Sequence, residues 1–419
     1  MRQVSSPWGL LPDGWKLSTI KKEMIVVTDY VANGSFASLA ENVQYSNTEE
    51  YAILIRLYDY NNNFSGNFVY VNEHAYNFLS KSKLYGDEII ISNVGANVGT
   101  VFKCPRLSKP MTLGPNSIVV KLNGNNDFYF YWFKSRYGKY CLDSIVSGSA
   151  QPKFNKTHFK EMPIPVPPLV EQEKIASILS ALDNKIAVNR RICANLEAQA
   201  QALFKSWFVD FTPFKDQPFV DSELGPIPQG WKVGKLRDYV EIKRGGSPRP
   251  IQKFLTSQGL NWLKISDATS TQSPFIFNIK EKIIINGLKK TVFLKAGSLV
   301  LSNSATPCIP KFLSIDSCIH DGWLYFPHSQ LPKNYLYLFF KLMRNNLVSK
   351  ANGSVFLNLK TDIVKNQVFA FSGEEIYNSF DKIIAPLFKE IENLTYETFQ
   401  LSALRDTLLP KLMSGEIKL

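Results

Sequence analysis

The sequence lacks the features of a membrane protein and of a protein cross-linked by disulfides or metal ions. Its 419 residues contain no run approaching the ~18 consecutive apolar residues that a membrane-spanning helix needs. The first ten residues lack the apolar stretch of a secretory signal. The five cysteines form no CxxC pair and the four histidines are scattered, which argues against a disulfide framework or a zinc site. We therefore expect a cytoplasmic protein with reduced thiols, no metal and no membrane contact.

The sequence is equally poor in catalytic motifs. It has no Gly-rich GxGxxG or GxxxxGK[ST] loop, and the nearest match to an N/D-P-P-Y/F methyltransferase motif, Val166–Leu169, lacks the polar first residue. Glu241-Ile242-Lys243, with Asp221 and Asp238 upstream, has the E-x-K form of a metal-dependent nuclease, but such short triplets arise by chance. No Ser/His/Asp or Cys/His grouping stands out. We expect no catalytic residues and no cofactor.

Positive charge is present in excess, and it is unevenly distributed. The formal net charge is +12, which favours a polyanionic partner. Residues 1–168 carry 17 basic and 13 acidic groups, and residues 213–372 carry 21 and 10, whereas 169–212 are balanced at 5 and 5 and 373–419 carry 5 and 8. The excess therefore belongs to two blocks, here called the first block (residues 1–168) and the second block (residues 213–372).

The two blocks repeat each other. Leu11-Pro12-Asp13-Gly14-Trp15-Lys16 returns as Ile227-Pro228-Gln229-Gly230-Trp231-Lys232. Two later landmarks recur at nearly the same offset: Ile91-Ser92-Asn93 with Leu301-Ser302-Asn303, and Ser147-Gly148-Ser149 with Asn352-Gly353-Ser354. Such a duplication predicts a pseudo-twofold molecule suited to a two-part ligand, of which duplex DNA is the obvious example.

Each block has the pattern of a mixed α/β domain that precedes a long helix. Short alternating apolar runs predict strands, and the aromatic-rich segments Phe128–Tyr140 and Asn334–Arg344 predict buried helices that serve core packing. The proline-rich run Met162–Pro168 predicts an extended, stiff connector at a domain boundary.

Two helices are expected to pair. Apolar or small residues at 175, 179, 182, 186, 193, 196, 200, 203 and 207, with polar Asn189 among them, form a heptad seam in a helix from Val170 to about Trp207. The second helix, Glu374 to about Met413, has a less regular stripe and contains Pro386, which predicts two segments or a bent rod. The stripe consists of Ile376, Phe380, Ile383, Leu387, Ile391, Leu394, Leu401, Leu404 and Leu408. With an internal twofold the two helices must run antiparallel.

Polar and basic loops are the candidate binding surface. The richest is Lys243–Pro250, which combines three cations with glycines that let backbone approach a phosphate, although it can equally be read as a solvated basic turn. Trp262, within Asn261–Asp267, is expected in the core. In the second block the candidates are Lys243, Arg244, Ser247, Arg249, Lys264, Ser266, Asp267, Lys289, Lys290, Asn303 and Lys311. In the first block they are Lys81, Lys83, Asn93, Asn97, Gln151 and Lys153.

Over essentially its whole length the chain resembles the specificity (S) subunit of type I restriction-modification systems. The features that carry the resemblance are both PxGW elements, Pro163–Glu173 (PIPVPPLVEQE), Leu182–Ile186 (LDNKI), Trp207–Phe211 (WFVDF) and Leu404–Ile417 (LRDTLLPKLMSGEI). The second block also resembles a common recognition domain of this family through Gly245-Gly246-Ser247-Pro248 and Trp262–Asp267. The first block lacks the GG[TS]P element.

The resemblance implies an α+β fold with a pseudo-twofold internal repeat: two mixed α/β target recognition domains separated by two long antiparallel coiled-coil helices. The domains would be 1–168 and 213–372, and the spacer helices 169–212 (the central conserved region of the family) and 373–419 (the C-terminal conserved region). Each domain would read one half of a bipartite site in double-stranded DNA. The helices would set the spacer and dock two methyltransferase subunits, restriction subunits would join them, and methylation and ATP-dependent cleavage would reside in these partners.

Two other function classes remain open on the sequence. A self-contained nuclease or methyltransferase would show activity, or bind a methyl donor, as the purified chain. A coiled-coil protein-protein scaffold without sequence-specific DNA binding would tolerate replacement of Lys243, Arg244 and Lys264, whereas a DNA-recognition subunit would lose DNA binding.

Overall fold

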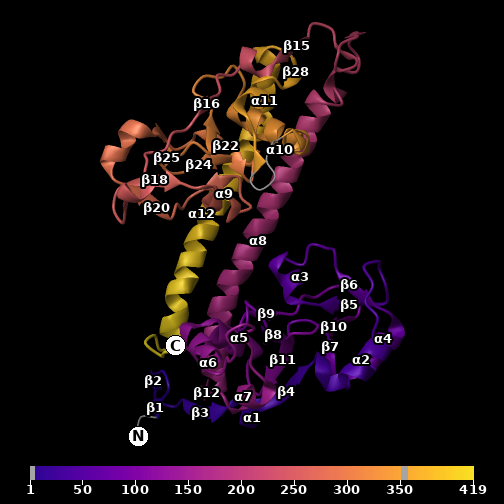
Figure 1. Ribbon diagram of the computed structural model, residues 1–419, viewed down its shortest axis with the longest axis vertical. Helices are drawn as coiled ribbons and strands as arrows, with labels where there is room; N and C mark the ends of the chain where they lie inside the picture. The colour runs from indigo at the N-terminus through magenta and orange to yellow at the C-terminus, as the bar shows by residue number, and fades with distance from the viewer. Residues whose placement is uncertain (1–4, 351–356) are drawn as a thin grey trace. The chain divides into compact units, whose positions relative to one another are not determined.

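The structure is a computed structural model that describes residues 5–350 and 357–419. The chain divides into two compact units, Met1–Asn184 with Ser402–Leu419, and Lys185–Leu401 (Figure 1). Each unit holds one of the two blocks and a part of both long helices. The Asn352-Gly353-Ser354 landmark lies outside the described residues.

The first block contains two four-stranded sheets. Their strand orders are β4-β11-β8-β9 and β6-β5-β10-β7, and the central pair of the second sheet, β5 and β10, is parallel. The strands of this unit are β1 (Ser5–Ser6), β2 (Gly9–Leu10), β3 (Lys16–Thr19), β4 (Met24–Asp29), β5 (Ala52–Ile55), β6 (Val69–Val71), β7 (Lys83–Leu84), β8 (Ile89–Ser92), β9 (Val101–Lys103), β10 (Met111–Leu113), β11 (Ser117–Leu122) and β12 (Pro163–Val166). Its short helices are α1 (Ile20–Glu23), α2 (Phe36–Asn42), α3 (Leu57–Asn61), α4 (Glu73–Phe78), α5 (Asn126–Lys134), α6 (Arg136–Ser144) and α7 (Lys156–Glu161).

The second block repeats this arrangement with one more strand in each sheet. The orders are β16-β26-β22-β24-β19 and β17-β20-β18-β25-β21, and the central strand of the second sheet, β18, is again parallel to a neighbour, β25. Its strands are β13 (Phe219–Val220), β14 (Ile227–Pro228), β15 (Lys232–Lys235), β16 (Lys243–Arg244), β17 (Leu255–Thr256), β18 (Leu260–Leu263), β19 (Phe275–Ile276), β20 (Glu281–Ile283), β21 (Val292–Leu294), β22 (Leu299–Ser302), β23 (Ser304–Ala305), β24 (Pro310–Leu313), β25 (Ser317–Ile319), β26 (Trp323–Tyr325), β27 (Leu357–Asn358) and β28 (Val368–Phe371). Its helices are α9 (Ile265–Thr269), α10 (Lys333–Ser349) and α11 (Thr361–Lys365).

Matching hydrogen bonds confirm that the blocks are duplicates. The Asn93 N–H after β8 donates to the Asn116 carbonyl at 3.0 Å, and the Asn303 N–H after β22 donates to the Gly322 carbonyl at 2.9 Å. Asn116 and Gly322 each precede a strand, β11 and β26. That strand pairs with the strand that ends one residue before the asparagine, β8 or β22. The Ile91–Asn93 and Leu301–Asn303 landmarks therefore occupy the same position in the two topologies.

Each block is closed by a two-stranded ladder that joins its beginning to its end. β3 pairs with β12 from Thr19↔Pro163 to Lys16↔Val166, and β15 pairs with β28 in the same antiparallel manner. The proline-rich run is extended, as predicted, but Pro163–Val166 form a strand of the first block instead of a connector. Pro163 and Pro165 fit there because alternate residues of an antiparallel pair point their N–H groups away from the partner.

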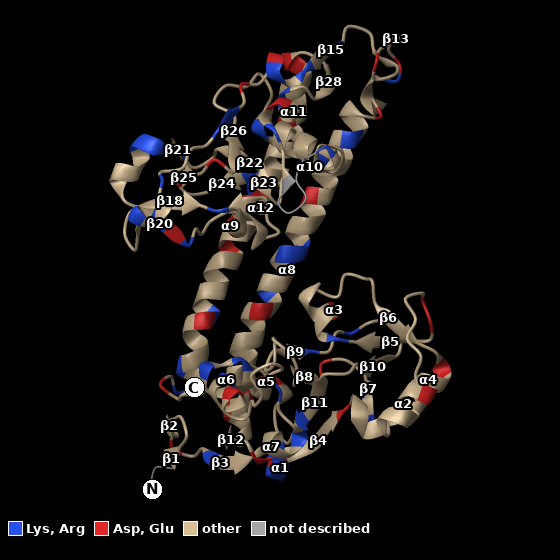
Figure 2. Ribbon diagram, in the orientation of Figure 1, with Lys and Arg blue, Asp and Glu red and all other residues tan. Residues whose placement is uncertain are grey.

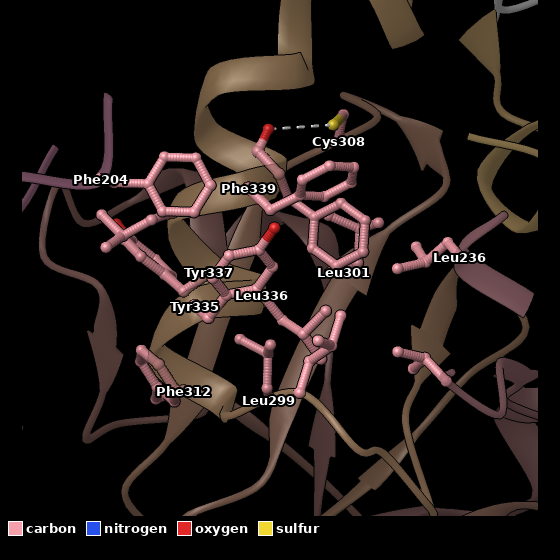
Figure 3. Packing of buried hydrophobic residues seen from close by; sticks show 14 of the residues in the cluster. Phe204, Leu236, Leu299, Leu301, Cys308, Phe312, Tyr335, Leu336, Tyr337 and Phe339 are labelled. Atoms are coloured by element: carbon pink, nitrogen blue, oxygen red, sulfur yellow. Dashed lines mark hydrogen bonds between the residues drawn. The ribbon is translucent and has the colours of Figure 1, made fainter. Parts of the chain in front are cut away.

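Aromatic helices form the cores, as the sequence predicts. Trp262 is also buried, at 3% exposed. In the first block the aromatic segment is broken into α5 and α6 at Ser135, whose hydroxyl accepts a hydrogen bond from the Gly138 N–H. In the second block α10 lies between the sheet and the long helices, since Tyr337 stacks on Phe312 of β24 and Tyr335 packs on Phe204 (Figure 3).

The long helices are α8 (Leu169–Phe208) and α12 (Glu374–Met413), and they pair antiparallel within each unit. In the second unit the predicted polar seam residue, Asn189, is fully buried and donates to Glu397 Oε2 at 2.7 Å. Further along α8, Phe208 stacks on Tyr377 near the start of α12. In the first unit Arg405 contacts Asp183 at 2.6 Å.

The α12 stripe differs from the expected one. The helix is continuous through Pro386, which is exposed, so separate segments are excluded. Proline lacks an N–H group, so the helix loses one backbone hydrogen bond there. The buried side chains of Ile384 and Phe388 hold the helix against the core on either side of Pro386. Ile383 and Leu404 were expected in the seam but are 45% and 47% exposed. No helix among the described residues is both long enough and apolar enough to span a membrane.

Candidate nucleic-acid interface

In the second block the ends of several strands meet at one edge. β18 and β25 are parallel and end side by side, and β16 and β22, both antiparallel to β26, end where β26 begins. The turn His320–Gly322 connects β25 to β26 and so joins the two sheets at this edge. The polar segments that follow these strands therefore gather there, and we call them the second edge. They are residues 243–250, 264–267, 289–290, 303–306 and 320–322.

Two glycines let the loop after β16 lie against this turn. A Cβ on Gly245 would lie well inside van der Waals contact of the His320 carbonyl, and one on Gly246 would lie 2.9 Å from the Lys290 carbonyl. The Gly246 N–H donates to the Ile319 carbonyl at 3.3 Å, at the end of β25. Glycine is required here for close packing between backbones, and the loop is thereby fixed on the edge.

Asp321 connects three of the predicted site residues. Its carboxylate accepts hydrogen bonds from the Ser247 hydroxyl at 2.6 Å and from Arg249 Nη2 at 3.0 Å, and its backbone carbonyl accepts from Arg244 Nε. The Ser247 hydroxyl, followed by the two arginines, holds the pKa of Asp321 below its usual value. Sequence reasoning missed Asp321 because it lies 74 residues from Ser247 and belongs to no motif.

The segment after β18 contributes one cation and one structural acid. Lys264 pairs with Glu281 Oε1 and is half-buried, while Ser266 is exposed. Asp267 is 4% exposed and accepts the Lys264 N–H at 2.9 Å, so it caps α9. The prediction that Asp267 contacts DNA is corrected, because its carboxylate faces the protein.

Further cations lie along the same edge. Lys289 and Lys290 are exposed at the end of a 3₁₀ turn (Ile285–Lys290), and the next residue, Thr291, donates its hydroxyl to the Ile319 carbonyl. Lys243 is exposed and pairs with Glu241 at 2.7 Å. Figure 2 shows basic positions in blue beside β21 and β26.

Two further predicted site residues, besides Asp267, are buried. Asn303 is 1% exposed, and its backbone N–H donates to the Gly322 carbonyl. Lys311 is 4% exposed, pairs with Val300 inside the sheet, and donates to the carbonyls of Thr271 and Ser273. Burial lowers the pKa of Lys311 to about 8. The prediction that these two side chains contact DNA is corrected.

The first block has a corresponding edge, here called the first edge. β5 and β10 are parallel and end together, and β4 and β8 end where β11 begins. Lys83 begins β7 opposite Thr112 near the end of β10, which places it and Lys81 at this edge. Lys83 lies 4.2 Å above the Tyr76 ring.

The other predicted residues of the first block form a compact group on this edge. Val94 pairs with Lys153, and the Gly95 N–H donates to the Pro152 carbonyl at 2.9 Å. Asn93 is half-buried and donates to the Phe154 carbonyl at 3.4 Å. The remaining members of the group are exposed: Asn97, Gln151 and Lys153.

The sequence did not single out Arg56, which occupies the position of Lys264. Each follows the strand of the parallel pair, and each donates its N–H to an aspartate three residues later, Asp59 at 2.8 Å and Asp267 at 2.9 Å. Arg56 also binds Asp59 through two guanidinium nitrogens, at 3.1 and 2.8 Å. The correspondence lies in the strand pairing and not in any shared sequence motif.

Neither edge offers a metal site. Within residues 5–350 and 357–419 no three or more His, Cys, Asp and Glu side chains come together as a metal centre would require. The cysteines at 104, 141, 308 and 318 are buried, and burial raises the pKa of each, so none is an activated thiolate. The chemistry that the edges present is hydrogen bonding and positive charge.

Comparison with known proteins places this arrangement in a class. A family described as "Type I restriction modification DNA specificity domain" matches residues 19–198. The chain is 28% identical over 317 residues to the type I restriction enzyme MjaIX specificity subunit of Methanocaldococcus jannaschii, covering 73% of this chain and 72% of that one. It is 26% identical over 315 residues to the HindI specificity subunit of Haemophilus influenzae, covering 60% and 68%.

A solved structure gives the same result for the fold. The type I restriction-modification S subunit from M. genitalium aligns with a TM-score of 0.58 over 96% of both chains, at 14% identity. Residues 19–198 are thus similar to the DNA specificity domains of type I restriction-modification systems. Over 73% and 60% of its length the chain is similar to two type I restriction enzyme specificity subunits, which confirms the resemblance read from the sequence.

Proposed function

We propose that this chain is the DNA sequence-recognition subunit of a type I restriction-modification complex, with each block reading one half of a bipartite site. The observation that carries the proposal is the duplicated topology, which presents polar and basic loops at the same strand ends in both blocks. Two similar but chemically different edges suit two different half-sites.

Recognition would combine two kinds of contact. Exposed lysines such as Lys81, Lys289 and Lys290 are suited to phosphates, which position the protein on the duplex. Exposed amide and guanidinium groups, such as those of Asn97, Gln151 and Arg249, are suited to base edges, since Asn and Gln pair with adenine and Arg with guanine. The corrected contact set therefore omits the buried Asp267, Asn303 and Lys311 and includes Arg56.

The long helices would set the spacer and dock two methyltransferase subunits, and restriction subunits would join that core. Apolar side chains remain exposed on both helices within the second unit, including Val188 at 38%, Ile192 at 40% and Phe399 at 42%. These positions are candidate contacts for the methyltransferase subunits. The names of the relatives support a recognition role without catalysis. We place methylation and ATP-dependent cleavage in the partners, in the cytoplasm where host DNA is accessible.

The test is to co-express the chain with its cognate methyltransferase subunit and to map methylated bases in the host DNA. We expect one split motif with a fixed gap. Replacing residues 213–372 with the corresponding block of a relative should then change one half of the motif and leave the other half and the gap unchanged.

A stable assembly that produces no split motif would overturn the proposal in favour of a protein-protein scaffold. The two functions are also separated by replacing Lys243, Arg244 and Lys264 together with alanine. Loss of DNA binding with retained methyltransferase binding supports recognition, whereas unchanged function of the complex supports the scaffold.

A further inference from the structure

The second edge contains a clasp that orients an exposed arginine. The clasp consists of Ser247 and Arg249 on the loop after β16 and Asp321 on the turn after β25. The Arg249 side chain is 78% exposed, yet Nη2 donates to Asp321 Oδ2 at 3.0 Å, and the other carboxylate oxygen accepts the Ser247 hydroxyl at 2.6 Å. Both carboxylate oxygens are therefore engaged, which fixes the plane of the group that Arg249 meets.

This geometry leaves most of the arginine available to a ligand. A guanidinium carries five N–H donors, and Asp321 takes one of them. An exposed arginine ordinarily loses rotamer freedom when it binds, and a fixed carboxylate removes part of that loss in advance. A fork of parallel N–H groups matches the O6 and N7 acceptors of guanine in the major groove.

We propose that Asp321 positions Arg249 to read a guanine in the half-site recognised by the second block. The inference rests on the proposed function and gives it a named base. Asp321 is a positioning residue in this scheme, and Arg249 makes the base contact. Arg244 is held differently, through the backbone carbonyl of residue 321, so a change of the Asp321 side chain leaves that hydrogen bond in place.

The experiment compares methylated motifs after co-expression of the full chain with its methyltransferase subunit. The variants are Asp321→Asn, Arg249→Lys and the double variant. We expect both single variants to relax the same single base pair of one half-site, with preference for G falling roughly tenfold in Arg249→Lys and roughly threefold in Asp321→Asn. The double variant should be no more relaxed than Arg249→Lys, because both changes break one unit.

Asp316→Asn is the matched control. Asp316 precedes the opposite end of β25, where it pairs with the exposed Lys295 at 2.8 Å and accepts the Ala296 N–H. It loses the same charge in the same block but lies away from the second edge, so its motif should equal that of the wild type.

Three results would overturn the inference while leaving the proposed function intact. The first is a wild-type half-site that contains no guanine. The second is an Asp321→Asn variant that methylates all sites more weakly but keeps the wild-type motif. The third is an Asp321→Asn variant that methylates additional sites without losing base preference at any single position of the motif. The second result would mean that the carboxylate only stabilises the structure. The third would mean that its negative charge weakens DNA binding at all sites. Absence of any split motif in the wild type would instead refute the proposed function itself.

Discussion

The first and second edges are built on the same strand ends but carry different chemistry. Arg244 ends β16 opposite Leu324, whereas Asp29 ends β4 opposite Ile118, the equivalent residue, and binds Lys156 at 2.8 Å. Asp321 corresponds to Pro115, whose side chain has no acceptor for an arginine. The comparison teaches that the sheets fix where side chains are presented, while the loops decide what is presented.

The difference extends beneath the edges. Lys311 pairs across the sheet with Val300, and the equivalent position in the first block, opposite Ile90, is Phe102. Phe102 is 1% exposed and stacks on Tyr60, whereas Lys311 uses its ammonium group to hold two loop carbonyls. One block fills this position with an apolar ring and the other with a buried cation.

The largest effect is expected from adding a side-chain atom at Gly245, between the loop after β16 and the turn His320–Gly322. Gly245→Ala would place a Cβ against the His320 carbonyl, which neither backbone can easily vacate, and should destabilise the second unit by about 3 kcal/mol. Urea denaturation of the full chain measures the change. Gly34→Ala in the first block is the control. The atoms nearest to its added Cβ are side-chain atoms at 3.3 Å, so it should lower the free energy of unfolding by less than about 1 kcal/mol. Equal destabilisation by the two substitutions would contradict the close backbone packing at Gly245.

The next effect concerns phosphate contacts at the second edge. Replacing Lys289 and Lys290 together with alanine should reduce DNA affinity by about 2 kcal/mol at low salt, regardless of sequence, and should reduce the slope of log K against log[salt] by about 1.8. A salt titration of the assembled complex gives both quantities. Lys333→Ala serves as the control, because the Lys333 amine donates to the Gly297 carbonyl away from the second edge. If the double replacement leaves the slope unchanged, DNA does not contact Lys289 and Lys290.

A smaller effect concerns the pH dependence of stability, which the buried Lys311 should alter and the equivalent Phe102 cannot. The pKa of Lys311 is about 8 in the folded chain and lies near 10.4 in an unfolded one, so the unfolded state binds more protons between these values and stability rises with pH. Between pH 7.5 and 9 this group should add about 1 kcal/mol to the stability of the wild type relative to Lys311→Met. Urea unfolding of both proteins at the two pH values tests it, and parallel pH dependences would show that Lys311 titrates normally.

The smallest effect tests the correspondence of Arg56 and Lys264. Arg56→Lys keeps the charge but removes the planar fork, and should change base preference roughly threefold in the half-site of the first block only. Lys264→Arg should act on the other half only. Methylation mapping reads both, and an effect of either variant on both halves would break the assignment of one edge to one half-site.

The sequence predicted the parts of this structure that depend on periodicity and repetition. The heptad pattern located α8 to within one residue at each end, and Glu374–Met413 matched α12. Asn189 was identified as a buried polar seam residue because its position in the heptad is a local property. The burial of Lys311 and the exposure of Ile383 were missed, since each depends on which face of a strand or helix meets a neighbour far away in the chain.

The candidate site was predicted only in part. Glycines and cations clustered in Lys243–Pro250 were visible as a motif, and the structure places that loop on an edge with Lys264 and Lys290. Asp321 and Arg56 were not visible. Asp321 acts through a contact across 74 residues, and the match of Arg56 to Lys264 emerges only when the strands are aligned, because the offset between the repeats changes along the chain.

The closing ladders, β3 with β12 and β15 with β28, have a consequence for how such a protein can change. Because the strand that enters each block is hydrogen-bonded to the strand that leaves it, everything between them is inserted at a single place. Gene segments bounded by these strands can then be exchanged between relatives without altering the helices that follow. A single exchange at one ladder would therefore replace one whole edge and leave the sequence of the other edge unchanged.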